Sequence, residues 1–193
     1  MQNLSSEYWN ERYKSANIGW DLGQVSPPIK EYVDQLNDKS IRILIPGCGN
    51  AYEAEYLHRQ GFSNVNVLDF ASEPLADLQR RVGDFPSEHL HQTDFFEHEG
   101  QYDLILEQTL FCAITPSLRP KYVEKVNRLL ASNGKLVGLL FNREFDGGPP
   151  FGGNRNEYEQ LFSKEFSKME INECYNSIAP RQGSEVFIRI EKD

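Results

Sequence analysis

Cysteine is scarce in this sequence, and its few copies lie far apart. Cys48, Cys112 and Cys174 are the only three in 193 residues, and their spacing fits neither a disulfide framework nor a zinc site. Free thiols of this kind are usual in a reducing compartment. We therefore expect three buried or half-buried thiols, no metal site and a cytoplasmic protein.

Basic charge and long apolar runs are also lacking. Basic side chains number 20 against 29 acidic ones, a net charge of -9, and an acidic surface repels the phosphates of nucleic acids. No apolar run approaches bilayer length, and the polar N-terminal residues lack the apolar core of a signal peptide. We expect no nucleic-acid partner, no membrane, a small-molecule ligand and, since no heptad or edge motif stands out, a monomer.

Strand-like and helix-like segments alternate along the chain, with no linker and no internal repeat. Residues 1–193 are therefore predicted to form one domain, with residues 1–40 as an N-terminal helical cap. The repeated units predict a doubly wound, Rossmann-like α/β sheet of about seven mostly parallel strands with a final antiparallel strand. The expected strands are 41–45, 65–68, 88–92, 102–107, 136–141, 166–174 and 185–190, and the expected helices are 5–14, 29–36, 52–60, 72–82 with Ser72 as N-cap, 118–130 and 157–162.

A glycine-rich turn follows the first core strand and is the most informative segment of the chain. Gly47 and Gly49 let backbone N–H groups approach a ligand, and the helix that follows favours an anionic group at its N-terminus. Twenty residues after Gly49, the next strand ends on Asp69, which can accept hydrogen bonds from both ribose hydroxyls. This layout predicts a site for an adenosine-containing ligand.

Aromatic residues bear on which adenosine ligand this is. After the third strand, Asp94 can accept from an adenine amino group and Phe95 can cover the ring; a turn aspartate beside a core phenylalanine is the alternative. Trp9, Tyr13 and Trp20 precede the first core strand, where a nicotinamide enzyme has no need of them. A sulfonium cation gains about 0.5–2 kcal/mol from aromatic faces, although the rings could simply pin a helix to the sheet.

Several longer motifs run through almost the whole chain. They are Trp9-x3-Tyr13-x6-Trp20-Asp21-x-Gly23, Ile45-Pro46-Gly47-Cys48-Gly49, Tyr102-Asp103-Leu104-Ile105, Phe111-Cys112-Ala113-Ile114-x-Pro116-x-x-Arg119-Pro120, Gly147-Gly148-Pro149-Pro150-Phe151 and Ile178-x-x-Arg181-x-Gly183. In these segments the chain resembles the thiopurine/thiol S-methyltransferase family of class I S-adenosylmethionine enzymes. The nearest likeness is the branch that includes the plant halide/thiol methyltransferases.

The resemblance implies S-adenosylmethionine as cofactor and a small thiol or similar soft anion as methyl acceptor. The residues that it implies for the cofactor are Trp9, Tyr13 and Trp20 as a lid, Gly47 and Gly49 beside the methionine part, Asp69 at the ribose, Asp94 and Phe95 at the adenine, and Gln108 between cofactor and acceptor. Gln108 is basic in the animal enzymes, and Phe141 stands where the halide enzymes carry tyrosine. These differences weaken the expectation of a carboxylated aromatic thiol or of a halide as acceptor.

The expected reaction is an in-line displacement that needs alignment and exclusion of water rather than a strong base. A thiol of pKa near 8.5 is partly ionised at neutral pH, and thiocyanate or halide needs no base. We expect Arg181 to attract an anionic nucleophile, although a solvated arginine fits as well. Glu107 either binds the cofactor's ammonium group or satisfies loop amides. The Gly-Gly-Pro-Pro loop at 146–153 is predicted to be part of a substrate lid.

Other classes of protein stay open at this stage. A nicotinamide-dependent oxidoreductase would be expected to carry the G-x-G-x-x-G pattern, but in this chain the third glycine is either replaced by Ala51 or absent. A binding protein without turnover, and an enzyme that methylates oxygen or nitrogen, share the cofactor with the leading hypothesis. His89 and His91 would lie on one face of a strand, where packed or solvated histidines are commoner than metal ligands.

Overall fold

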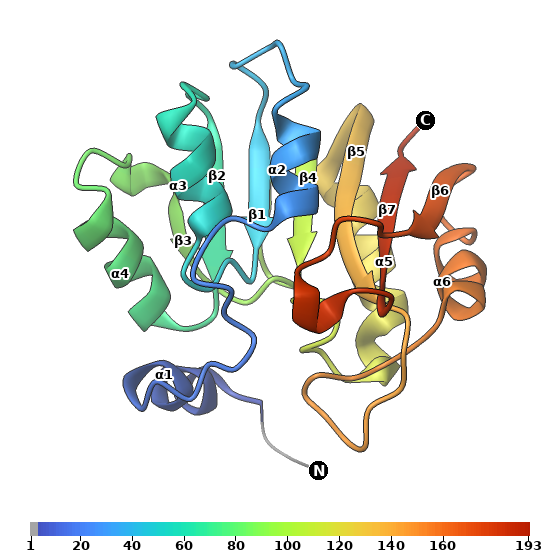
Figure 1. Ribbon diagram of the computed structural model, residues 1–193. Helices are drawn as coiled ribbons and strands as arrows, with labels where there is room; N and C mark the ends of the chain where they lie inside the picture. Colours follow the sequence, from blue (N-terminus) through green and yellow to red (C-terminus); the bar gives the residue numbers. More distant parts are fainter. Residues whose placement is uncertain (1–3) are drawn as a thin grey trace.

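A computed structural model describes residues 4–193 (Figure 1). The helices are α1 Ser6–Lys14, α2 Pro27–Val33, α3 Tyr52–Arg59, α4 Ser72–Arg81, α5 Arg119–Leu129 and α6 Arg155–Phe162. The strands are β1 Ile43–Pro46, β2 Val65–Asp69, β3 Leu90–Gln92, β4 Tyr102–Gln108, β5 Leu130–Phe141, β6 Lys168–Glu173 and β7 Glu185–Glu191.

The strands form one seven-stranded sheet in the order β3-β2-β1-β4-β5-β7-β6. The five strands from β3 to β5 are parallel, and β7 runs antiparallel to both of its neighbours. This confirms the predicted Rossmann-like α/β sheet. Strand order reverses between β1 and β4, and ligands of doubly wound sheets bind beyond the carboxyl ends of the strands at that point.

Helices cover both faces of the sheet. Apolar side chains of α2, α3 and α4 pack on one face around Ile43, Val67 and Val137. Those of α5 and α6 pack on the other, around Tyr122 and Ile188. Strands buried on both faces need nearly continuous apolar sequence, which is what β1 and the second half of β5 carry.

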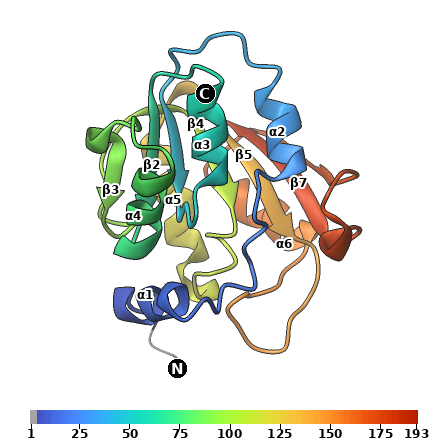
Figure 2. The same ribbon diagram turned by 60° about the vertical axis from the view of Figure 1, so that its left-hand side comes forward.

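The N-terminal helix α1 covers neither face and lies beneath the carboxyl ends of the strands (Figures 1 and 2). Ser5 caps it, because its hydroxyl accepts a hydrogen bond from the N–H of Tyr8. Asn10 ties α1 to the core: its side-chain oxygen accepts from the N–H groups of Ser72 and Glu73, at 3.0 and 3.2 Å. Two orphan donors at the start of α4 are thus satisfied from a distant helix.

That contact corrects one prediction, since Ser72 begins α4 but Asn10 supplies the cap. Most elements lie within two residues of their predicted bounds, and two differ by more. Helix α2 begins at Pro27 and ends at Val33 rather than spanning 29–36, because proline suits the first helical positions. Strand β5 begins at Leu130 rather than at 136, with a register shift where it pairs with the start of β4. Asn133 takes a positive φ there, which marks an irregularity inside the strand.

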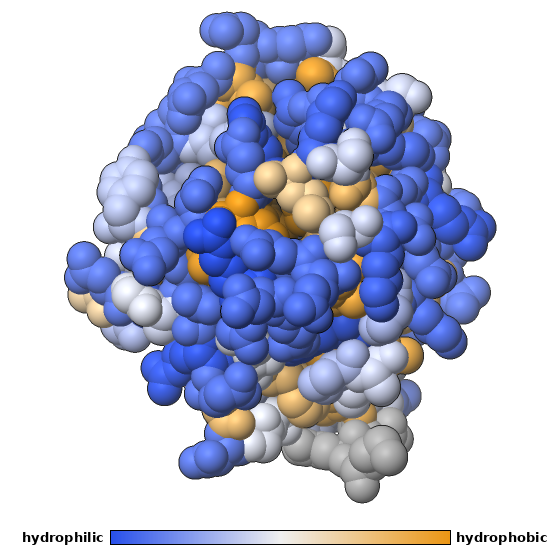
Figure 3. Space-filling model, turned by 90° about the vertical axis from the view of Figure 1, so that its right-hand side faces the viewer, coloured by the Kyte–Doolittle hydropathy of each residue, from blue (hydrophilic) through white to orange (hydrophobic). Residues whose placement is uncertain are grey.

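The side of the molecule that carries α6 and β6 is mostly hydrophilic, with a small apolar area in a hollow at its centre (Figure 3). No helix within residues 4–193 combines the length and the apolar character needed to cross a bilayer.

Candidate active site

A large cavity opens at the carboxyl edge of the sheet, between α1 and the loops that follow the strands. Its volume of about 670 Å³ lies within the range of small-molecule sites. Eight of the eleven predicted site residues line it, namely Trp9, Tyr13, Trp20, Gly47, Asp69, Asp94, Phe95 and Arg181. Gly49, Glu107 and Gln108 are not among its lining residues.

The glycine loop has the backbone shape expected of a ligand-binding turn. Gly47 and Gly49 have φ of +60° and +51°, a region that side chains rarely adopt. A Cβ on Gly47 would lie 2.9 Å from Cβ of Leu110, and one on Gly49 would lie 3.0 Å from the hydroxyl of Tyr13. The loop therefore has no room for side chains, and Gly49, although outside the cavity lining, keeps Tyr13 close to the loop.

Asp69 ends β2 with its carboxylate held by two backbone groups. Oδ2 accepts from the N–H of Gly49 at 3.0 Å, and Oδ1 accepts from the N–H of Ala71 at 2.9 Å. Each oxygen keeps a lone pair for a ligand hydroxyl. Burial raises the pKa of Asp69 to about 6, opposed by the hydrogen bonds from Ala71 and Gly49. The structure thus presents a fixed acceptor pair at the position predicted for ribose.

Asp94 and Phe95 follow β3 at the same edge. One oxygen of Asp94 accepts from the N–H of Phe96 at 2.9 Å, which fixes the turn and leaves the other oxygen without a partner among residues 4–193. Phe95 is almost fully buried and stacks on Tyr122 while one side faces the cavity. Phe70 was not predicted as a site residue from the sequence. Its exposed ring lines the cavity directly after Asp69, and its place after an acidic strand end was the signal.

The three N-terminal rings gather into one cluster that lines the cavity. Trp20 meets Trp9 and Tyr13 edge to face, with ring centroids 5.5 and 5.8 Å apart. Arg12 lies over Trp20 at 4.9 Å. Burial, followed by the negative charge of Asp69, raises the pKa of Tyr13, so its hydroxyl stays neutral. These rings do more than pin a helix to the sheet, because all three also line the cavity.

Glu107 satisfies a loop amide, which is one of the two roles that the sequence left open. Its side chain is fully buried; one oxygen accepts from the N–H of Phe111 at 2.9 Å and the other from the hydroxyl of Tyr122 at 2.5 Å. Burial raises the pKa of Glu107 to about 7, opposed by those contacts. The side chain holds the loop after β4 and does not reach the cavity.

A smaller cavity of about 10 Å³ lies beside the large one and contains Gln108. Gln108 ends β4, and Glu185 begins β7, on the other side of the end of β5. Both residues line the smaller cavity. Arg181 lines the large cavity from the connection between β6 and β7, as predicted, and donates to the carbonyl of Trp20 at 2.8 Å. Glu185 had no signal in the sequence pattern.

The histidines and cysteines do not form a metal site within residues 4–193. Nε2 of His91 hydrogen-bonds Asn66 at 2.9 Å, and that of His98 hydrogen-bonds Tyr102 at 2.8 Å. Burial, followed by the charge of His91, lowers the pKa of His98 to about 4. Burial likewise raises the pKa of Cys112 to about 12, so this thiol stays protonated.

Together, these features fit an adenosylated sulfonium. The cavity has a glycine cradle that a Cβ would fill, an acidic acceptor pair at the position predicted for ribose, and three aromatic rings among its lining residues. Combined with the strand order, they define a Rossmann-like methyltransferase that uses S-adenosylmethionine. A solved methyltransferase from Burkholderia thailandensis, which acts on 1,6-didemethyltoxoflavin, has the same fold, with a TM-score of 0.72, 16% identity, and coverage of 97% of this chain and 87% of its own.

Sequence similarity identifies the family of methyltransferases to which the chain belongs. The model of the thiopurine S-methyltransferase family matches residues 4–190. The chain is 30% identical to the probable thiol methyltransferase 2 of Arabidopsis thaliana, over 100% of this chain and 88% of that protein. It is 29% identical to the thiocyanate methyltransferase 1 of Brassica oleracea, over 95% and 84%. The chain belongs to the thiopurine S-methyltransferase family, which confirms the predicted resemblance.

Proposed function

We propose that this protein transfers a methyl group from S-adenosylmethionine to the sulfur of a small thiol. The observation that carries the proposal is a single cavity that joins the glycine loop and Asp69 to an apolar region at the ends of β4 and β5. Leu110, Phe141 and Phe145 line that region, which suits a soft, weakly hydrated nucleophile. The similarity to a thiol methyltransferase supports the same choice.

Within this proposal the cofactor would lie over the ends of β1, β2 and β3. Asp69 would accept from the ribose hydroxyls, and the free oxygen of Asp94 would accept from the adenine amino group between Phe70 and Phe95. The chain of the methionine part would pass Gly47. When bound, the cofactor supplies a methyl group on a sulfonium leaving group, and the rings of Trp9, Tyr13 and Trp20 would face its positive charge.

The protein's own contribution is alignment and exclusion of water. The aromatic cluster is held over the strand ends by three contacts from separate parts of the chain. Asn10 binds the start of α4, Asp21 accepts from the side chain of Asn50 at 2.8 Å, and Arg181 binds the carbonyl of Trp20. A fixed lid of this kind keeps water away from the methyl group while the acceptor enters between α1 and the 146–153 loop.

We further propose that residues 1–193 act as one domain, as a monomer in the cytoplasm. The three free cysteines, the acidic charge and the mainly hydrophilic surface in Figure 3 support this. Sedimentation of the purified protein at several concentrations tests the oligomeric state, and a concentration-dependent dimer would contradict it.

Calorimetric titration with S-adenosylhomocysteine, with NADH as control, tests the cofactor. We expect binding of S-adenosylhomocysteine alone. Incubation with S-adenosylmethionine and 2-mercaptoethanol, followed by mass spectrometry of the products, then tests the reaction, and a methyl thioether is the expected product. A folded protein that binds only NADH, or that binds S-adenosylhomocysteine but yields no methylated sulfur, contradicts the proposed function.

A further inference from the structure

The smaller cavity adjoins the larger one at the acceptor end. Thr109, Cys112 and Phe141 line both cavities, so the two cavities meet along these side chains. A volume of about 10 Å³ is roughly the space that one water molecule needs. The smaller cavity can therefore hold a single water next to the place where an acceptor would lie.

Three buried polar atoms around this cavity have no hydrogen-bond partner among residues 4–193. They are the side-chain nitrogen and oxygen of Gln108 and Oε2 of Glu185. Each unpaired buried group costs about 1–3 kcal/mol, and native proteins keep such groups mainly where a ligand or water completes them. Glu185 is only 4% exposed, so its free oxygen has no access to bulk solvent.

The other oxygen of Glu185 faces Arg181. Oε1 lies 3.4 Å from Nη1 of Arg181, and the two side chains are 3% and 11% exposed. The guanidinium also lies over the ring of Phe141, 5.3 Å from its centroid. Because the positive charge of Arg181 already has a buried counter-charge, this end of the cavity has no net charge with which to hold an anion. Arg143, at the cavity rim, is exposed and screened by solvent.

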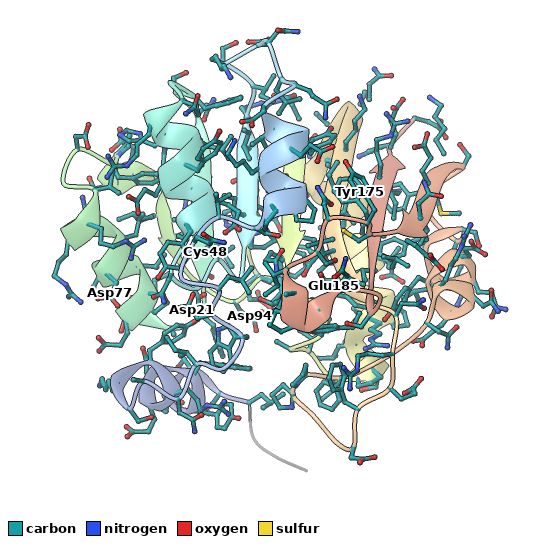
Figure 4. The ribbon with its side chains drawn as sticks, in the orientation of Figure 1. Asp21, Cys48, Asp77, Asp94, Tyr175 and Glu185 are labelled. Atoms are coloured by element: carbon teal, nitrogen blue, oxygen red, sulfur yellow. The ribbon has the colours of Figure 1, made fainter. Side chains whose placement is uncertain are left out.

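We infer that Glu185 is the proton acceptor for a neutral thiol, through one water held by Gln108. The inference rests on the proposed function and specifies its substrate class: protonated thiols rather than permanent anions such as thiocyanate. Figure 4 labels Glu185 at the same edge of the sheet as Asp94, which belongs to the proposed cofactor region.

The S–H bond of the thiol breaks, its proton passes to the water, and the water gives a proton to Oε2 of Glu185. The sulfur's electron pair forms the new bond to the methyl carbon, and the electron pair of the broken carbon–sulfonium bond stays on the cofactor's sulfur. Cys112 remains a protonated part of the wall and does not compete, since its Sγ donates to the carbonyl of Thr109 at 3.2 Å.

The test is Glu185→Gln assayed with two acceptors, 2-mercaptoethanol and potassium thiocyanate. Loss of a general base costs about 10²–10⁴-fold in rate, so turnover of 2-mercaptoethanol should fall by that order. Thiocyanate needs no proton acceptor, and removal of the counter-charge of Arg181 should lower its KM. Calorimetry should show an unchanged affinity for S-adenosylhomocysteine. Glu173→Gln, an exposed glutamate at the end of β6, is the matched control and should change nothing.

Gln108→Leu provides a second variant, which removes the groups that hold the water but no charge. It should also slow 2-mercaptoethanol selectively. Equal loss with both acceptors, in a variant with normal S-adenosylhomocysteine binding and melting temperature, would mean a structural role and overturn the inference. A wild-type protein that prefers thiocyanate would also overturn the inference, while the proposed function, methylation of thiols, would be unaffected. If the wild type methylates neither acceptor, the proposed function fails instead. Should Glu185→Gln not fold, Gln108→Leu decides between these outcomes.

Discussion

The two ends of the cavity treat their polar groups in opposite ways. At the cofactor end, both oxygens of Asp69 and one of Asp94 already accept hydrogen bonds from the backbone. At the acceptor end, Gln108 and Oε2 of Glu185 have no partner within residues 4–193. A preorganised end suits a cofactor that is the same in every turnover, because the protein needs no rearrangement to bind it. Unpaired groups beside the other end suit a step in which a proton and a variable acceptor arrive together.

The largest loss of cofactor binding should come from the most fixed group of the cofactor end. Asp69→Ala removes the proposed ribose acceptors and should weaken S-adenosylhomocysteine binding by at least about 100-fold, since two hydrogen bonds to a charged group contribute about 1.5–3 kcal/mol each. Calorimetry measures this directly. Asp77→Ala, on the outer part of α4 and paired with Arg80, is the matched control. An unchanged affinity in Asp69→Ala would remove Asp69 from the site.

Gly47→Ala should affect both folding and binding. Its φ of +60° costs a side-chain-bearing residue about 1–2 kcal/mol, and the new Cβ would lie 2.9 Å from Leu110. We expect the free energy of unfolding to fall by about that amount, and binding of S-adenosylhomocysteine to weaken with it. Gly83→Ala, at an ordinary φ with nothing within 4 Å, should be close to neutral. Equal denaturation curves for the two variants would contradict this account of the loop.

Acidification should weaken cofactor binding through Asp69. With its pKa near 6, about a tenth of the carboxylate is ionised at pH 5, so affinity there should be about tenfold lower than at pH 8. The stability of the ligand-free protein should change with pH in the opposite direction. Asp69 has a higher pKa in the native state than in the unfolded chain, so its ionised form lowers the free energy of unfolding above pH 6. This loss of stability disappears as pH falls toward 4. Asp69→Asn should abolish the pH dependence of binding, and a dependence that persists in this variant would assign it to another group.

The smallest effect concerns the lid. Asn10→Ala removes the cap that α1 supplies to α4, and loss of a cap costs about 1 kcal/mol. We expect a modest loss of stability in urea and a small loss of affinity for S-adenosylhomocysteine, because Trp9 and Tyr13 lie on the same helix. Asn17→Ala, beyond the end of α1, is exposed and serves as control. If Asn10→Ala were as stable as the wild type, water would be as good a cap for α4 as the side chain of Asn10.

The sequence was sufficient for the cofactor end, because its signals are local. The glycine turn, the strand that ends on Asp69 and the pair Asp94 and Phe95 each occupy a few consecutive residues. The sheet order follows from alternating elements in the same way. Only the aromatic lid required a longer motif for its prediction, since its rings are spaced along α1 and the loop after it.

The acceptor end could be predicted only in part: Gln108 and Arg181 were expected there, but Glu185 depends on contacts between distant segments. Gln108 and Glu185 line one small cavity only because the sheet places β4 and β7 on either side of β5, and no local motif marks Glu185. The cap from Asn10 to α4 is equally non-local, so the hydroxyl of Ser72 looked sufficient from the sequence. The hydrogen bond from the hydroxyl of Tyr122 to Glu107 had no local signal either, because the two residues lie on different elements.

The division between the two ends can be tested in one experiment on Asp69→Asn and Glu185→Gln side by side. Affinity for S-adenosylhomocysteine and kcat with saturating S-adenosylmethionine and 2-mercaptoethanol are measured for both. We predict that Asp69→Asn loses affinity and keeps most of its kcat, whereas Glu185→Gln keeps affinity and loses kcat. Two variants that lose affinity and kcat in the same proportion would contradict the division of the cavity into a cofactor end and an acceptor end.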